Sequence, residues 1–167
     1  MRKADSMIIL YVSLILMVVF SLTYAMNGVA MSMFSGKAEE VILFSPIEGV
    51  LTFEGKPTSG AKILRKINWK DEVGETDIFY ANEKGEFTLP IKKESIKISS
   101  ITQFVVHQKI DVFYAGKNFV IWTIGKDSKS EFGELNGKPK NFRCELTDDD
   151  VPYRLENALL LTSCKWS

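Results

Sequence analysis

Short runs of alternating apolar and polar residues follow one another along the chain from residue 47 onward. In EGVLTFEG, residues 48–55, Leu51 and Phe53 alternate with Val50 and Thr52. A period of two is typical of strands that bury one face, and turn-forming residues separate the runs at intervals of about ten residues. The pattern predicts about seven strands, which fall within residues 48–55, 60–69, 75–91, 95–116, 117–125, 141–147 and 156–166.

Two further segments bear on the strand prediction. Residues Val41 to Phe44 are a candidate first strand, and Val151 to Leu161 fit either a short helix or a strand. Beyond the N-terminal apolar run, no window of helical length has a convincing helical period. Short strands with regular turns pack most naturally as two antiparallel sheets. We therefore predict an all-β domain, a seven-stranded antiparallel sandwich.

The segment EGKPTSG, residues 54–60, has the glycine content of a ligand-binding loop. A phosphate-binding loop requires a strand, a Gly-rich loop and the first turn of a helix, in that order. Here an alternating strand pattern follows the glycines instead of a helix. Gly55 and Gly60 tolerate positive φ, and Pro57 favours a turn. We interpret the segment as the corner between two strands.

The N-terminus carries a long uncharged stretch, MIILYVSLILMVVFSLTYAM, at residues 7–26. Twenty helical residues span roughly 30 Å, the hydrocarbon thickness of a bilayer. Arg2 and Lys3 precede the run, so the positive-inside rule leaves the amino end in the cytoplasm and exports the remainder. We predict one N-terminal transmembrane helix in the bacterial inner membrane, with the domain in the periplasm.

The same stretch also has features of a cleavable signal peptide. Its strongest apolar core, Met7 to Phe20, has signal-peptide length, and small residues at Ala25 and Ala30 offer cleavage sites. We favour a retained anchor, because the apolar stretch continues past a usual signal core; a cleaved, periplasmic form is the alternative. The predicted division is an anchor at 1–36, a linker at 37–46 and an exported sandwich domain at 47–167.

Charge and cysteine content narrow the class of function. Lys plus Arg and Asp plus Glu number 21 each, so the chain lacks the positive excess that nucleic-acid binding requires. The two cysteines, Cys144 and Cys164, both fall in the exported part, where an even pair is read as a disulfide. Two free buried thiols are the alternative.

Residue types that carry catalysis are sparse. His107 is the only histidine and lies in a strand pattern, with neither a nucleophile elbow nor a second metal ligand at useful spacing. Glu131, Glu134 and Glu145 could supply a carboxylate pair, but acids in a turn-rich segment are more often solvated. Residues 147–150, TDDD, lack the glycine and distal glutamate of a calcium loop. We predict a protein that is not an enzyme and has no cofactor or metal.

The order of several motifs resembles the carboxypeptidase-regulatory-like domains, which have transthyretin-like topology. The matching residues are Gly49-Val50, Gly55-Lys56-Pro57, Gly60-Ala61-Lys62-Ile63, Thr76-Asp77, Asn82-Glu83-Lys84-Gly85-Glu86-Phe87 and Leu89-Pro90. The inserted Phe79-Tyr80-Ala81 departs from that pattern and lengthens one strand. The second half contains Tyr114, Trp122, Glu131, Glu134 and Cys144-Glu145-Leu146. With these residues it resembles an uncharacterised family of small bacterial envelope proteins of the kind encoded beside toxin effectors of contact-dependent secretion. That resemblance implies an immunity role.

These observations favour a membrane-anchored periplasmic domain that binds another protein, with a secreted toxin as one such partner. The alternatives are a structural accessory subunit of an envelope assembly and, less favoured, an exported hydrolase. Trp122 fits a core strand, whereas Trp69 stands among charged residues in the segment 65–80, which is longer than a hairpin needs. Because exposed aromatic residues commonly anchor interfaces, the predicted partner-binding residues are Trp69, Lys70, Asp71 and Glu72.

Overall fold

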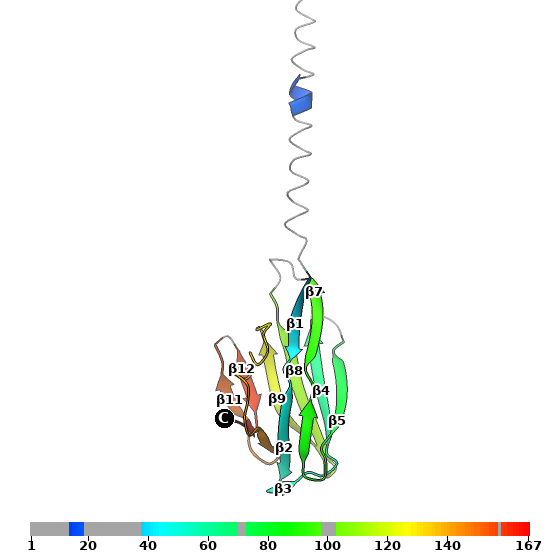
Figure 1. Ribbon diagram of the computed structural model, residues 1–167, viewed down its shortest axis with the longest axis vertical. Coiled ribbons are helices and arrows are strands. Elements are labelled where there is room, and N and C mark those ends of the chain that lie inside the picture. Colours follow the sequence, from blue (N-terminus) through cyan, green and yellow to red (C-terminus); the bar gives the residue numbers. More distant parts are fainter. Residues whose placement is uncertain (1–13, 19–37, 70–72, 98–102, 157) are drawn as a thin grey trace, which may run out of the picture. The chain divides into compact units, whose positions relative to one another are not determined.

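A computed structural model describes residues 14–18, 38–69, 73–97, 103–156 and 158–167 (Figure 1). The chain divides into two compact units, Met1–Ala38 with Lys97–Thr102, and Glu39–Ile96 with Gln103–Ser167. Of the first unit, the structure describes the helical residues 14–18 and two strand residues, Ala38 and Lys97. The second unit is built of strands, so the all-β prediction is confirmed.

The larger layer of the second unit is a six-stranded sheet in the order β11-β12-β9-β8-β4-β5. Every neighbouring pair in it is antiparallel. The sheet can be followed in Figure 1 from β11 across to β5. Its strands are β4 (Lys62–Trp69), β5 (Glu75–Tyr80), β8 (Val106–Tyr114), β9 (Lys117–Lys126), β11 (Val151–Arg154) and β12 (Leu159–Thr162).

The other layer is a five-stranded sheet, in which β13, β10, β2 and β3 follow one another and β6 also pairs with β2. Its strands are β2 (Ile47–Phe53), β3 (Lys56–Pro57), β6 (Glu86–Leu89), β10 (Arg143–Glu145) and β13 (Cys164–Lys165). The β2–β10 pair is parallel, and the other pairs are antiparallel. Strands β1 (Ala38–Phe44) and β7 (Lys92–Lys97) form a separate two-stranded sheet.

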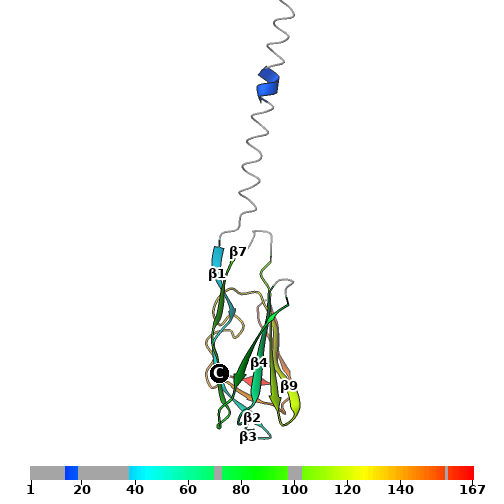
Figure 2. The ribbon, with the colours of Figure 1, turned by 90° about the vertical axis from the view of Figure 1, so that its right-hand side faces the viewer.

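The hydrophobic core lies between the two layers; in the side view of Figure 2, β1 of the separate two-stranded sheet lies toward the left and β9 of the six-stranded sheet toward the right. Alternation along each strand supplies it: Ile63 and Ile67 of β4, Leu51 of β2 and Trp122 of β9 are all buried. Trp122 therefore occupies the core position predicted for it. Apolar burial of this kind is the main favourable contribution to folding.

The corner at residues 54–60 is a hairpin, as predicted. Glu54 and Gly55 have φ values of 51° and 74° and join β2 to β3, whose register pairs Phe53 with Lys56. Positive φ at two successive residues is the geometry of a two-residue hairpin loop, and it matches the twist of the flanking strands.

The structure contains more strands than predicted, thirteen among the described residues. The predicted linker 37–46 includes β1, whose Val41, Leu43 and Phe44 are buried. The segment 151–161, left open between helix and strand, belongs to the β11–β12 hairpin. The segment 65–80 belongs largely to the β4–β5 hairpin, in which Ile67 pairs with Glu75.

Within the described ranges, no helix is long and apolar enough to cross a membrane. Most of the apolar run at 7–26, on which the predicted anchor depends, lies outside those ranges.

Candidate functional site

The strongest candidate site lies on the outer face of the five-stranded sheet, where three strands meet. Parallel pairing of β2 with β10 and antiparallel pairing of β10 with β13 place Val50, Arg143 and Lys165 in one row across the sheet. Neighbouring residues of a strand point to opposite faces. Leu51, Cys144 and Cys164 form the next row and are buried beneath the first.

A disulfide joins Cys144 of β10 to Cys164 of β13, with Cα atoms 4.0 Å apart. The bond closes a separation of 20 residues. The chain-entropy model gives such a loop a stabilisation of about 3 kcal/mol. Because the bonded residues lie directly beside Arg143 and Lys165, the disulfide also fixes the spacing of these two outward side chains.

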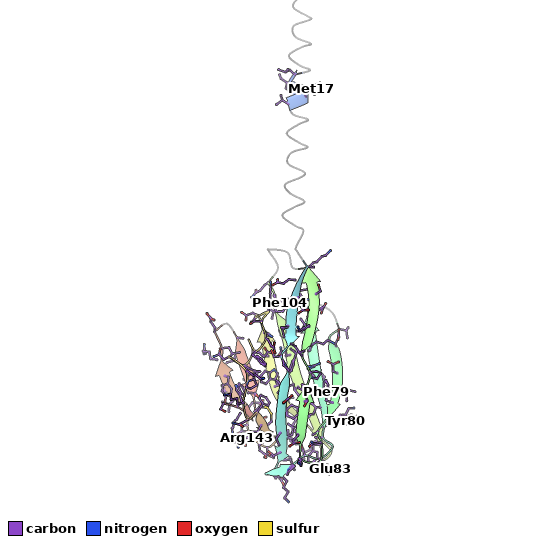
Figure 3. The ribbon with its side chains drawn as sticks, viewed as in Figure 1. Met17, Phe79, Tyr80, Glu83, Phe104 and Arg143 are labelled. Carbon is purple, nitrogen blue, oxygen red and sulfur yellow. A yellow bond between two sulfur atoms is a disulfide. The ribbon has the colours of Figure 1, made fainter. Side chains whose placement is uncertain are left out.

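Two adjoining hollows of about 580 and 520 Å³ lie over this row, and Asn141, Arg143 and Lys165 line both of them. We call the combined surface the β10 groove. Val50, Thr52, Gly55, Glu145, Asp148 and Ser163 also line the first hollow, and Trp166 and Ser167 line the second. In the view of Figure 3, Arg143 and Tyr80 lie on opposite sides of the domain.

Of the four charged side chains that line the first hollow of the β10 groove, two form an ion pair with each other. The Lys165 ammonium lies 2.6 Å from the Asp148 carboxylate. The Glu145 carboxylate accepts hydrogen bonds from the backbone N–H groups of Glu54 at 2.9 Å and Gly55 at 3.0 Å. Arg143 is exposed and forms no ion pair with any residue that the structure describes. Arg143 is therefore the groove cation without an ionic partner among the described residues, although the two cations of the first hollow, Arg143 and Lys165, are matched in number by the carboxylates of Glu145 and Asp148.

Glu145 holds the hairpin corner against β10. Partial burial raises the pKa of its carboxyl group, but hydrogen bonds from Thr147, Thr52 and the Gly55 backbone outweigh burial and lower the pKa to about 2. An ionised carboxylate is a stronger acceptor than a neutral one. The Glu145 carboxylate is consequently ionised at neutral pH and is held in place by its hydrogen bonds.

The structure corrects the interpretation of Glu134 as a solvated turn residue. Its side chain is 0% exposed and lies 2.8 Å from the ammonium of Lys126, which is 1% exposed. Glu134 also accepts hydrogen bonds from the Ser45 N–H at 2.8 Å, the Ser45 hydroxyl at 2.9 Å and the Gln108 amide at 3.2 Å. Glu131, by contrast, is exposed.

The prediction that Trp69 is an exposed anchor is wrong. Trp69 is the last residue of β4 and is 8% exposed, with its ring centroid 4.8 Å from that of Phe104. Inward residues alternate along β4, and Trp69 continues the row of Ile63, Arg65 and Ile67. Lys70, Asp71 and Glu72, predicted beside it, lie outside the described residues.

The remaining candidates do not assemble into a reactive cluster. His107 is exposed on β8, and Asp148 of the acidic turn is paired with Lys165. Across the described ranges, no group of three or more His, Cys, Asp or Glu side chains is placed to hold a metal ion.

Arg143 and Lys165 do not form a cluster along the chain, because they are 22 positions apart. The available signal was the cysteine pair: residues flanking a cross-strand disulfide point outward together, because side chains alternate along each strand. Arg143 precedes Cys144 and Lys165 follows Cys164.

Fold and site together define a disulfide-braced, all-β domain with a groove on one sheet that charged side chains help to line. The chain belongs to the family described as Domain of unknown function (DUF6795), whose model matches residues 47–149, more than half of the chain. That range contains Arg143, Cys144 and Glu145, whereas Cys164 and Lys165 follow it. Neither a curated protein nor a solved structure matches the chain.

Proposed function

We propose that this chain is a membrane-tethered, exported domain that binds another protein through the β10 groove. The observation that carries the proposal is Arg143, an exposed residue that lines both hollows and has no ionic partner in the described structure. Arginine is enriched among the residues that dominate protein interfaces. The disulfide beneath it favours binding, because a surface held rigid before contact loses less entropy on association.

Export and tethering are supported by the sequence and by the disulfide. The disulfide between Cys144 and Cys164 is compatible with an oxidising compartment such as the periplasm. The uncharged run at 7–26, preceded by Arg2 and Lys3, supports an anchor with its amino end in the cytoplasm. The second half of the domain resembles envelope proteins encoded beside toxin effectors. That resemblance implies that the partner is a toxin, which the domain neutralises.

We also propose that the sandwich shares the transthyretin-like topology of the carboxypeptidase-regulatory-like domains. When β1, β3, β7, β11 and β12 are set aside, the remaining strands form two sheets of four, β6-β2-β10-β13 and β5-β4-β8-β9. Such a two-sheet sandwich supports the resemblance, and so do the hairpin at Gly55-Lys56-Pro57 and the turn at Asn82–Gly85.

Binding explains the acidic side chains better than hydrolysis does. A general acid must hold a proton near neutral pH, and the pKa of Glu145 is lowered to about 2. Glu134 is enclosed by Lys126, Ser45 and Gln108. Both carboxylates are committed to holding strands and turns together.

A second candidate function, an accessory subunit of an envelope assembly, is favoured by a different surface. The outer face of the six-stranded sheet exposes Ile78 (52%), Tyr80 (64%) and Phe113 (45%). Ile78 and Tyr80 lie on β5 and Phe113 on β8, the strands on either side of β4, whose Lys62 pairs with both Tyr80 and Phe113. Grouped apolar side chains of this kind often mark contacts with other subunits.

Site-specific photo-crosslinking in the native cell distinguishes the two surfaces. A photoreactive amino acid replaces Ser167, which lines the second hollow, or Tyr80 on the six-stranded sheet. Groove binding predicts a discrete protein adduct from position 167 and none from position 80. An adduct from position 80 alone would contradict groove binding and favour the accessory subunit, and no adduct from either position would contradict both.

A further inference from the structure

A separate cavity of about 210 Å³ lies between the segment that follows β9 and the turn that joins β11 to β12. It shares no lining residue with the two hollows of the β10 groove. Pockets for drug-sized ligands have volumes of about 300–1,000 Å³, so a ligand of this cavity is small. We call it the β9 cavity, and its polar lining residues are Lys126, Asp127, Ser128, Glu134, Asn136 and Glu156.

Lys126 has hydrogen-bond donors that the fold leaves unused. Its side chain is 1% exposed, and its ammonium lies 2.8 Å from the Glu134 carboxylate. An ammonium has three N–H donors, and no further acceptor for them lies among the residues that the structure describes. Because a buried donor without an acceptor is costly, these N–H groups favour an oxygen atom inside the cavity.

Glu134, by contrast, has its acceptor positions filled. A carboxylate offers about four such positions. One oxygen accepts from the Ser45 N–H and the Gln108 amide. The other oxygen accepts from the Ser45 hydroxyl and lies beside the Lys126 ammonium. The Lys126–Glu134 pair is therefore neutral as a unit, and it offers the cavity hydrogen-bond donors without net charge.

The other charged groups of the β9 cavity are both acidic. Asp127 and Glu156 form no ion pair with any residue that the structure describes. One ammonium and three carboxylates thus line the cavity, which gives it a formal net charge of −2. A cleft of this sign attracts cations and repels anions. Glu156 is exposed and Asp127 half-buried, so both lie nearer the solvent than the buried Lys126.

We propose that the β9 cavity binds a small ligand in which an ammonium group stands beside an oxygen acceptor, a chemistry shared by the amino terminus of a peptide and by amino alcohols. The ligand oxygen accepts from Lys126 at the buried end, and the ligand ammonium pairs with Asp127 and Glu156 nearer the solvent. A cation without an oxygen would leave the Lys126 donors unused, and an anion would meet three carboxylates. The inference goes beyond groove binding and does not depend on it.

The test is an NMR titration of the full-length protein in micelles of an uncharged detergent, which follows the backbone amide signals of Asp127, Ser128 and Gly133. The pH is about 6.5, below the ordinary pKa of α-amino groups. The probes are glycinamide, which has the ammonium and carbonyl of a peptide amino terminus, and ethanolamine, a simple amino alcohol. We expect saturable shifts with at least one of them. Whichever probe binds more tightly identifies the source of the ligand.

Three control compounds separate the contributions to binding. N-acetylglycinamide keeps the carbonyl without the charge, ethylamine keeps the charge without the oxygen, and glycine adds a carboxylate. We expect each to bind at least ~10-fold more weakly than the better probe, because charge-assisted hydrogen bonds are roughly twice as strong as neutral ones and a negative cavity repels a carboxylate.

Two variants locate the interaction. Asp127→Asn and Glu156→Gln each remove one carboxylate from the cavity, so we expect either change to weaken binding of the better probe by roughly 10-fold. Asp149→Asn removes a charge at an exposed position outside the cavity and should leave binding unchanged. A melting temperature close to that of the unchanged protein shows that a variant is folded.

Any of four outcomes would overturn the inference: no saturable shift with either probe, binding of a control compound as tight as that of the better probe, unchanged binding by both Asp127→Asn and Glu156→Gln, or an equal loss in Asp149→Asn. None of these outcomes bears on groove binding, because the protein adduct at position 167 reports a surface that shares no lining residue with the β9 cavity.

Discussion

Replacing Glu134 with Gln removes the charge that neutralises Lys126 in the interior of the sandwich. The two side chains are 0% and 1% exposed, and their charged groups lie 2.8 Å apart. Removing one partner of a buried pair leaves the other charge uncompensated, which costs about 3–5 kcal/mol of unfolding free energy. Small domains have only about 5–15 kcal/mol in total.

The surrounding hydrogen bonds favour the upper part of that range. The carboxylate of Glu134 accepts three hydrogen bonds, two from Ser45 and one from Gln108. Ser45 in turn accepts from the Phe132 N–H at 2.7 Å, and Gln108 accepts from the Trp122 indole at 3.2 Å. A glutamine can supply only one acceptor oxygen in place of two, so part of this network loses its partner.

Urea unfolding of the full-length protein in detergent, followed by tryptophan fluorescence, measures the effect. We expect Glu134→Gln to reduce the unfolding free energy by about 3–5 kcal/mol, which corresponds to a fall in melting temperature of roughly 6–20 °C. The double variant Glu134→Leu with Lys126→Met removes both charges and should be much closer in stability to the unchanged protein. A loss below about 1 kcal/mol for Glu134→Gln, or a double variant less stable than the single one, would refute this reasoning.

Three further predictions concern the corner, a turn and the topology. The pKa of Glu145 is about 2 in the folded protein and 4.5 ordinarily, so the ionised carboxylate contributes its full stabilisation above pH 4.5 and loses it as the pH falls toward 2. In acid titrations of the unfolding free energy, Glu145→Gln should lack this loss. A variant with the same pH profile as the unchanged protein would contradict the prediction. Gly85 has φ of +75° and an added Cβ would lie 2.4 Å from the Leu51 carbonyl oxygen, whereas Gly116, with φ of +73°, has nothing within 4 Å. Gly85→Ala should therefore destabilise the domain in urea by at least ~1 kcal/mol more than Gly116→Ala, and equal losses would argue against the close contact. A reporter active only in the periplasm, fused after Ser167, should be active, and activity confined to the cytoplasm would contradict export.

The strands themselves could be predicted from the sequence because their pattern is local. Period-two alternation in residues 60–69 and 117–125 specifies which side chains face inward, and it correctly predicts Trp122 in the core. The same alternation assigns Trp69 to the core, since it continues the inward row of β4. The polar residues beside Trp69 in the sequence indicate an exposed side chain instead. That indication is misleading, because charged neighbours near a strand end do not specify which way the last side chain of the strand points.

The groove could not be predicted, because it results from pairing between distant segments. Val50 and Arg143 become neighbours only through the parallel pairing of β2 with β10. The burial of Glu134 likewise depends on Lys126 at the end of β9 and on Ser45, the residue after β1. Neither partner can be recognised from the residues around Glu134.

The central claim, that Arg143 is the contact through which the domain binds its partner, is tested most directly by the yield of the adduct formed from position 167. The measurement compares the unchanged protein, Arg143→Gln and Lys62→Gln, at equal amounts of folded protein in the native cell. We predict at least a ~10-fold lower yield for Arg143→Gln, the size of effect expected of an interface residue that contributes more than about 1.4 kcal/mol, and an unchanged yield for Lys62→Gln. Equal yields from all three proteins would contradict the claim.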